Sequence, residues 1–168
     1  MPADWIRPVD VERLADVGES REFDLPLGEL PRLTPALAST DGLARCRVTF
    51  AREQGQPVAT VAVNARLGLR CQRCLKPVWT DVDSESRVRF VTDPASVDEN
   101  DLGIEPTLAP EGRIALRDLL EEELLLSVPI VPRHGDPREC DGLEVEEDEA
   151  EEMQRPFAGL GELLKRKN

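Results

Sequence analysis

Apolar and polar residues alternate along the middle of the chain in three consecutive segments, residues 43–53, 58–71 and 78–91. A period of two places successive side chains on opposite faces of a β-strand, so each segment is expected to be a half-buried strand. A turn containing Gly55 and Pro57 joins the first pair, and a short connection joins the second. The pattern predicts an antiparallel β-meander and leaves open whether the sheet closes into a barrel.

The next apolar pattern is helical and follows an acidic stretch rich in Pro and Gly, residues 92–112. This stretch is expected to be a loop, with a short extended piece around Ile104 as an option. Over residues 113–129, leucines recur at spacings that place them on one face of a helix, while Glu121 and Glu122 are expected to point away from the core. Pro129 ends this helix. The leucines of its apolar face are Leu116, Leu119, Leu120 and Leu124.

These elements predict an α+β fold in which one amphipathic helix packs on the meander. In the N-terminal part, residues 21–30 are expected to be extended and residues 33–37 to form a short helix. We assign residues 1–132 to a single domain. Residues 133–155 are expected to be a flexible acidic linker, too polar to bury a core of its own, and residues 156–168 a short amphipathic C-terminal helix.

The C-terminal helix is predicted from the sequence "RPFAGLGELLKRKN", in which four apolar residues share one helical face and the last residues are basic. Such a short apolar face does not hold an isolated helix together. The helix is therefore expected to dock, either on its own domain or on a partner, and both alternatives stay open. The residues of the docking face are Phe157, Leu160, Leu163 and Leu164.

The net charge of −13 argues against wholesale electrostatic binding to nucleic acid, but the charge is unevenly distributed. Residues 44–91 carry nine basic and four acidic side chains, net +5, whereas residues 135–155 carry two and ten, net −8. No segment approaches the roughly 18 apolar residues of a membrane span, and the N-terminus has no apolar leader. We expect a cytoplasmic protein with reduced thiols and no membrane partner.

Cys71 and Cys74 form a C-x-x-C pair between the second and third predicted strands. Zinc takes about four ligands in a tetrahedron, and His134 and Cys140 are the candidates for a second pair. Zinc is thus a candidate cofactor, and reduced structural cysteines are the alternative. A redox pair is disfavoured because it belongs at a helix N-terminus, and strands flank this one. Cys46 is in phase with core residues and is expected to be a small buried hydrophobe.

Basic residues gather around this cysteine turn. On a sheet surface they form either an ordinary solvated face or a patch that binds RNA phosphates with salt-dependent affinity. The chain has no Tyr, four Phe and two Trp, so base-specific recognition is not supported. The candidates for RNA contact are Arg66, Arg70, Arg73, Lys76 and Trp79.

Sequence signatures of catalysis are missing. The chain has no P-loop, no G-x-G-x-x-G and no G-x-S-x-G motif, and its single histidine has no evident nucleophile partner. Its carboxylates are spread through loops and the acidic tail. We therefore expect no enzymatic activity, no catalytic residues and no small-molecule substrate.

Three motifs in order carry a family resemblance. They are "LRCQRCLKPV", then "LRDLLEEELLLSVPIVPRH" followed by Cys140, and finally "RPFAGLGELLKRK". Together they resemble the bacterial YceD/DUF177 family, the large ribosomal RNA subunit accumulation proteins, over residues 40–168. The resemblance implies a non-enzymatic cytoplasmic role in the synthesis, processing or stability of 23S ribosomal RNA.

The partners that the resemblance implies are 23S rRNA or its precursor, or a large-subunit ribosomal protein. A protein–protein adaptor or chaperone for a basic ribosomal protein, without direct RNA contact, is the alternative from another class. The resemblance does not decide whether zinc is bound, because some family members lack one or both thiols of the C-x-x-C pair. It supplies no catalytic residues.

Overall fold

The computed structural model describes residues 5–93 and 104–140. Two regions with expected functions, the acidic residues 141–155 and the apolar box at 156–168, lie outside the described residues. Within the described part, no helix is long and apolar enough to cross a membrane.

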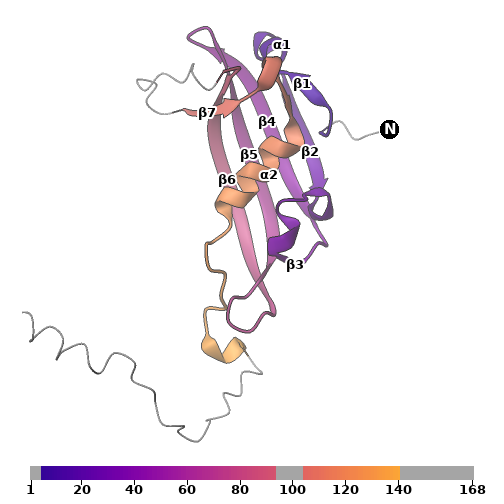
Figure 1. Ribbon diagram of the computed structural model, residues 1–168, viewed down its shortest axis with the longest axis vertical. Helices are drawn as coiled ribbons and strands as arrows, with labels where there is room; N and C mark the ends of the chain where they lie inside the picture. Colours follow the sequence, from indigo (N-terminus) through magenta and orange to yellow (C-terminus); the bar gives the residue numbers. More distant parts are fainter. Residues whose placement is uncertain (1–4, 94–103, 141–168) are drawn as a thin grey trace, which may run out of the picture.

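The fold is built on one large, mostly antiparallel sheet of order β2-β4-β5-β6-β7, with β3 pairing separately with β5 (Figure 1). Neighbouring strands are antiparallel except at one edge, where β7 runs parallel to the end of β6. A second, two-stranded sheet pairs β1 with β8. The strands are β1 (Pro8–Asp10), β2 (Ser20–Pro26), β3 (Leu37–Ser39), β4 (Leu43–Glu53), β5 (Gln56–Arg70), β6 (Pro77–Val91), β7 (Glu105–Leu108) and β8 (Arg113–Ala115).

The expected meander is confirmed as β4, β5 and β6. The register places Cys46 of β4 opposite Val63 of β5, and Val63 opposite Ser84 of β6, so the inward faces stay in phase across three strands. Gln54 and Gly55 both have positive φ angles, 48° and 81°, as the tightest right-twisting hairpin connections require. The alternation seen in the sequence therefore corresponds directly to one buried and one exposed face.

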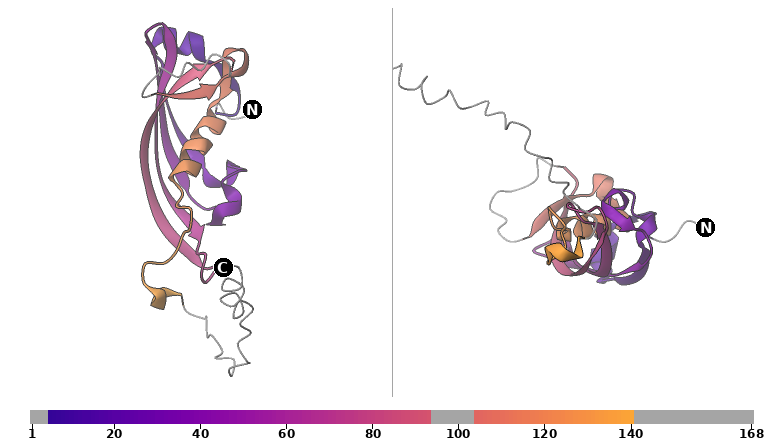
Figure 2. Two further views of the ribbon diagram at one scale, coloured as in Figure 1. Left: turned by 60° about the vertical axis from the view of Figure 1, so that its left-hand side comes forward. Right: turned by 90° about the horizontal axis from the view of Figure 1, so that it is seen from below.

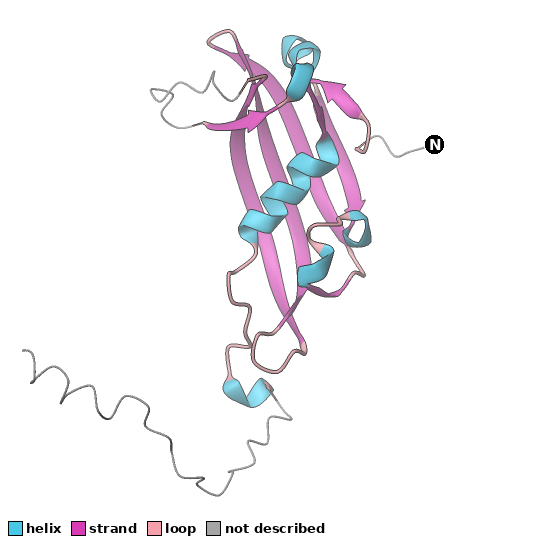
Figure 3. Cartoon of the chain, in the orientation of Figure 1, coloured by secondary structure: helices cyan, strands magenta, loops and turns pink. Residues whose placement is uncertain are grey.

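The sheet curls along its length, and helix α2 (Leu116–Ser127) lies across its concave face (Figures 2 and 3). The sheet stays open, with β2 at one edge and β7 at the other. The helix buries its four expected leucines, and it packs on β5 and β6. This arrangement confirms the α+β prediction of one amphipathic helix packed on the meander.

The N-terminal part holds a helix that the sequence pattern did not reveal, α1 (Val11–Val17), at the end of the sheet away from the β5–β6 turn (Figure 1). The Asp10 side chain caps its N-terminus, and Gly18 ends it in the left-handed conformation at φ 63°. The expected extended segment is β2, and the expected short helix is the 3₁₀ turn η2 (Thr34–Ala36). A similar turn, η1 (Leu27–Glu29), follows β2.

The expectation that Glu121 points away from the core is wrong. Its side chain is 1% exposed, and its carboxylate accepts hydrogen bonds from the backbone N–H groups of Arg32 and Leu33, at 2.6 and 3.0 Å. The helical pattern alone gave no sign of this, because the donors lie in a loop 88 and 89 residues away. Glu122 does face solvent, where it pairs with the Arg32 guanidinium.

Candidate metal centre

The C-x-x-C pair lies in the connection between β5 and β6, at the end of the sheet away from α1. The connection is closed by two backbone hydrogen bonds, from the Cys71 N–H to the Lys76 carbonyl at 3.0 Å and from the Leu75 N–H to the Cys71 carbonyl at 2.9 Å. Leu75 adopts a positive φ of 61°, which reverses the chain direction before β6 begins at Pro77. The tight turn directs Cys71 and Cys74 toward the same point.

The second half of the site comes from the segment after α2, which returns along the sheet to this turn (Figure 1). The Gln72 N–H donates to the Pro132 carbonyl at 2.8 Å and fixes this segment against the turn. The 3₁₀ turn η5 (Pro137–Glu139), capped by Asp136, then directs Cys140 back toward the cysteine pair. Residues 133–140, assigned from their composition to the acidic linker, thus lie against the β5–β6 connection.

These two segments bring three thiols and one imidazole together. The ligand atoms of Cys71, Cys74, His134 and Cys140 all lie within 4.8 Å of one another. The Cys71 and Cys140 sulfurs are 3.9 Å apart, and the His134 Nδ1 atom is 3.6 Å from the Cys74 sulfur and 3.5 Å from the Cys140 sulfur. The four residues predicted as a ligand set are therefore one cluster.

Half of the separations in this cluster match those of a tetrahedral zinc site. Zinc bonds of about 2.3 Å to sulfur and about 2.0 Å to nitrogen place two sulfurs about 3.8 Å apart, and a sulfur and a nitrogen about 3.5 Å apart. Three of the six separations, that between Cys71 and Cys140 and those from His134 to Cys74 and Cys140, lie within about 0.2 Å of these values, and the other three are no longer than 4.8 Å. Cys71 and Cys140 are buried, while Cys74 and His134 are partly exposed. The four residues could hold a metal ion at the surface of the domain.

A second contact orients the imidazole. The His134 Nε2 atom lies 3.0 Å from the Pro77 carbonyl oxygen. A carbonyl only accepts, so Nε2 carries the proton and Nδ1 keeps its lone pair toward the thiols. Histidine ligands in metal sites are held in the same way by a carbonyl or carboxylate behind the ring.

The thiols of the cluster differ in acidity. Burial raises the pKa of the Cys71 thiol, but N–H groups of Cys74, Arg73 and His134 point at its sulfur, outweigh burial and lower the pKa to about 5. Burial, together with the neighbouring thiols, raises the pKa of Cys140. N–H donors aimed at a sulfur favour the thiolate, which is the form that binds a metal.

The structure also bears on the two other roles considered for the cysteines, a redox pair at Cys71 and Cys74 and a buried structural thiol at Cys46. Strands precede and follow the C-x-x-C pair, as expected, so the helix N-terminus of a thioredoxin-type redox pair does not occur there. Cys46 lies far from the cluster in the chain and on the concave face of β4, 4% exposed. Burial, followed by the charge of Asp24, raises the pKa of Cys46 to about 12, as for an inert core thiol.

The exposed cations near the cluster are mostly unpaired. Arg70, Arg73 and Lys76 lie on the β5–β6 connection, and the returning segment adds Arg133 and Arg138, which the sequence had not connected with this site. All five side chains are exposed, and none forms an ion pair within residues 5–93 and 104–140. We call these five residues the basic turn.

Trp79 and Arg66 lie beside the basic turn on the convex face. The register pairs Trp79 with Gly68, and a Cβ atom added at Gly68 would lie 3.0 Å from the indole, so the ring covers this glycine. The Arg66 guanidinium lies 5.4 Å from the centroid of the same ring and 3.8 Å from the Asp81 carboxylate. Trp79 remains 52% exposed.

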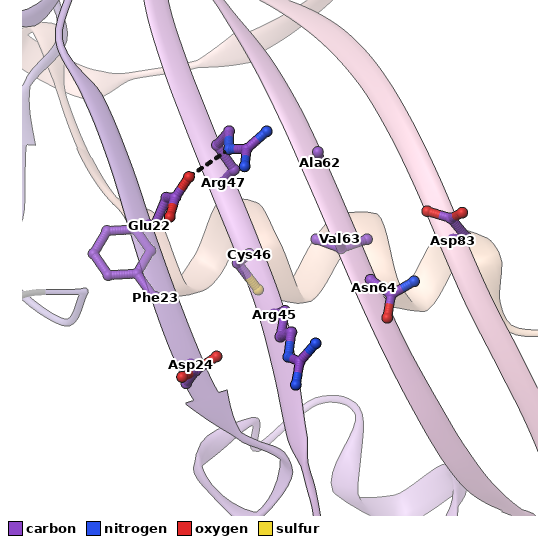
Figure 4. Close-up of a pocket in the computed structure, with 10 residues that line it drawn as sticks. All are labelled: Glu22, Phe23, Asp24, Arg45, Cys46, Arg47, Ala62, Val63, Asn64 and Asp83. Carbon is purple, nitrogen blue, oxygen red and sulfur yellow. Dashed lines mark hydrogen bonds and ion pairs between the residues drawn. The ribbon is translucent and has the colours of Figure 1, made fainter.

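Other arginines of residues 44–91, the segment with a net charge of +5, lie away from the basic turn. On the convex face of β4, Arg47 forms an ion pair with Glu22 at 2.7 Å, and Arg45 faces Asp24 across the ladder, beside an open depression of about 390 Å³ (Figure 4). Arg89 of β6 is only 6% exposed and so does not belong to a solvated face. Arg47, Arg52 and Arg87 are thus neutralised by ion pairs with carboxylates, unlike the cations of the basic turn.

Comparison with known proteins gives one family. Residues 59–164 match the family described as "Large ribosomal RNA subunit accumulation protein YceD". No solved structure matches this chain at a significant level. The matched region contains most of β5, all of β6 and α2, and the four residues of the metal-ligand cluster, and it spans well over half of the sequence. The chain belongs to the YceD family, whose description assigns it a role in accumulation of large-subunit ribosomal RNA.

Proposed function

We propose that this protein is a non-enzymatic cytoplasmic ribosome-biogenesis factor that contacts 23S rRNA or its precursor through the basic turn, with zinc holding that turn in shape. The observation that carries the proposal is the joining of two distant segments, residues 70–76 and 132–140, by one four-ligand cluster. Membership of the YceD family supplies the ribosomal context.

Zinc at this cluster would act structurally. Cys71, Cys74, His134 and Cys140 supply all four positions of a tetrahedron, which leaves no open position for water or substrate. A metal there would cross-link two segments that are otherwise tied by few hydrogen bonds. This donor set supports a structural role and gives no support to catalysis.

The basic turn suits phosphate rather than base recognition. Its cations are exposed, free of local ion pairs and close together, so they are available to neutralise several phosphates. Trp79, already stacked with Arg66, provides one aromatic surface beside it. The expected mode is salt-dependent binding with little sequence readout, and the RNA's shape would select the site.

Binding of purified zinc-loaded protein to a 23S rRNA transcript, measured over a range of salt concentrations, tests the proposal. Reversing Arg70, Arg73 and Lys76 to Glu should lower the affinity at least tenfold and reduce the slope of log K against log salt by about 2, or roughly 0.7 per lost phosphate contact. Equal affinity and slope would refute contact at the basic turn.

A matched control keeps the change in net charge constant. Arg7, Arg13 and Arg113 are exposed, lie at the end of the sheet near α1, and form no ion pair in the described part of the chain. Their reversal to Glu should leave most of the RNA affinity in place. An equal loss in both variants would mean that only net charge matters.

A second candidate is the adaptor for a basic ribosomal protein, and one observation favours it. In the described part of the chain, β7 covers only Val88–Val91 of the outer edge of β6, so residues 78–87 have no strand partner there. This edge carries Asp81, Asp83 and Glu85 on its exposed face. An open edge with acidic side chains suits an extended basic peptide, which would add as a further strand.

The two candidates differ in their sensitivity to mutation. Replacing Asp81, Asp83 and Glu85 with Lys, or deleting residues 141–155, should abolish capture of a basic large-subunit protein if the adaptor function is correct. RNA binding would then survive. Direct RNA contact is supported if RNA binding is lost only in the variant with Arg70, Arg73 and Lys76 reversed, and capture of the basic protein is unchanged in the other variants.

A further inference from the structure

The groove between α2 and β7 is an apolar surface without a partner in the described residues. It has a volume of about 300 Å³ and is lined by residues of β6, β7, β8 and α2, together with Arg32 from the loop after η1. Leu126, in the last turn of α2, is 65% exposed on its rim, and Ile130 just beyond the helix is 99% exposed. The apolar residues that line the groove are Val88, Pro106, Ile114, Leu119 and Leu126.

The groove is also acidic. It is lined by Asp118, Glu122 and Glu123 against one cation, Arg32, which pairs with Glu122, while Arg117 outside the groove pairs with Asp118 at 3.0 Å. Glu123 is buried, and the hydroxyl groups of Ser84 and Ser86 donate to its carboxylate. An occupant that fits this surface has an apolar face followed by positive charge.

We propose that the C-terminal box of this same chain, residues 156–168, docks as a helix in the groove between α2 and β7. The box has the required chemistry, since its apolar face is followed directly by three cations. A four-residue apolar face needs such a surface to be stable as a helix. The apolar residues are Phe157, Leu160, Leu163 and Leu164, and the cations are Lys165, Arg166 and Lys167.

The chain length permits this docking and sets its direction. Cys140 follows Ser127, the end of α2, by 13 residues, so the two lie at most about 45 Å apart, whereas the 16 residues from Cys140 to Pro156 can span about 55 Å. The box therefore reaches the groove from the C-terminal end of α2. It is expected to run antiparallel to the helix.

The antiparallel register matches apolar with apolar and basic with acidic residues. Phe157 and Lys165 are eight residues apart, as are Leu126 and Asp118, so both pairs span about 12 Å along a helix. With Phe157 against Leu126, the basic end of the box lies beside Asp118 and Glu122. Tethering on the same chain gives an effective concentration on the order of millimolar, which favours this contact over one with a second molecule.

A photo-crosslinking experiment on the full chain tests the docking. The probe is benzoylphenylalanine in place of Phe157, in zinc-loaded protein mixed from unlabelled and ¹⁵N-labelled chains. The expected result is crosslinks within one chain, to residues 118–126 of α2. Crosslinks only between chains would assign the groove to a second copy, and crosslinks elsewhere or none would assign the box to another partner; each of these results overturns the proposal.

Charge exchange tests the proposed register, with the yield of the same crosslink as the readout. Changing Asp118 and Glu122 to Lys should lower the intramolecular crosslink yield about fivefold, and changing Lys165, Arg166 and Lys167 to Glu in the same chain should restore it. The matched control changes Asp81 and Glu85, on the convex face, to Lys and should leave the yield unchanged. Circular dichroism checks that each variant is folded, and no loss or no rescue counts against the proposed register.

Discussion

The His134 Nε2 atom lies 3.0 Å from the carbonyl oxygen of Pro77, the first residue of β6. This one contact links the segment after α2 to the start of a strand 57 residues earlier and turns Nδ1 toward the sulfurs of Cys74 and Cys140. It gives the imidazole one tautomer and one orientation before any metal arrives. The cluster is therefore preorganised in two ways: its four ligand residues lie close together, and the Pro77 carbonyl fixes the orientation of the His134 ring.

Metal binding is the first prediction. Native mass spectrometry of the purified protein should show one zinc ion per chain, and Cys74→Ser or His134→Ala should lose it. Cys46→Ala should retain it, because this thiol lies in the core away from the cluster. A chain with no zinc mass and four freely titrating thiols would contradict the assignment.

Chelation should loosen only one end of the molecule. Zinc cross-links residues 70–76 and 132–140, whereas the core between the meander and α2 is independent of the cluster. Hydrogen exchange after removal of zinc should therefore accelerate in these two segments while β4 and the central part of β5 stay protected. Uniform deprotection of the whole sheet would show that the metal supports the entire fold instead.

Alkaline conditions should destabilise the core through Cys46. Burial raises the pKa of this thiol to about 12 from its ordinary value of about 9, so the folded state holds its proton more tightly than the unfolded state. Its contribution is fully present below pH 9 and is lost as pH rises through 12. Denaturant unfolding of wild type and Cys46→Ala across this pH range measures the free energy of unfolding of each protein. The advantage of wild type over the variant should shrink as pH rises.

Glu121 should be important for stability, unlike its neighbour. Glu121→Ala leaves the Arg32 and Leu33 N–H groups without their acceptor, at a cost of about 2–5 kcal/mol in the free energy of unfolding. Glu122→Ala breaks only an exposed ion pair and should cost less than about 1 kcal/mol. Chemical denaturation of both variants provides the comparison, and equal costs would disprove the role of the buried carboxylate.

Gly68 should control the position of Trp79. In Gly68→Ala the new Cβ would lie 3.0 Å from the indole, so the ring must shift and its fluorescence spectrum should change. The cost in stability should stay below about 1 kcal/mol, because Trp79 is half-exposed and can move. Gly28→Ala, where the nearest atom is 3.7 Å from the new Cβ, is the control and should leave the spectrum unchanged.

The sequence predicted the features that depend on local periodicity. Alternation along residues 43–91 identified β4, β5 and β6, and the leucine spacing identified α2 and its buried face. The four possible metal ligands were also recognised, because the C-x-x-C pair needed partners and the chain offers few. Their assembly at one point depended on the path of residues 128–140, which no periodicity encodes.

Other features depend on long-range contacts and were missed for that reason. Glu121 has the polarity of a surface residue and is buried only because a distant loop supplies two N–H donors. The strand β7 begins one residue after Ile104, where a short extended piece was an option, but its parallel pairing with β6 could not be predicted from the local pattern. Arg133 and Arg138 belong to the basic turn only because the chain after α2 returns to the β5–β6 connection, a path that the sequence pattern does not indicate.

The central claim is that the basic turn contacts large-subunit rRNA, and RNA crosslinking in living cells tests it most directly. Wild-type protein should yield crosslinked 23S rRNA or its precursor, and the Arg7, Arg13 and Arg113 reversal should yield the same RNA. The Arg70, Arg73 and Lys76 reversal should lose most of this signal while remaining folded and zinc-loaded. An undiminished 23S signal from that variant would contradict the proposed contact.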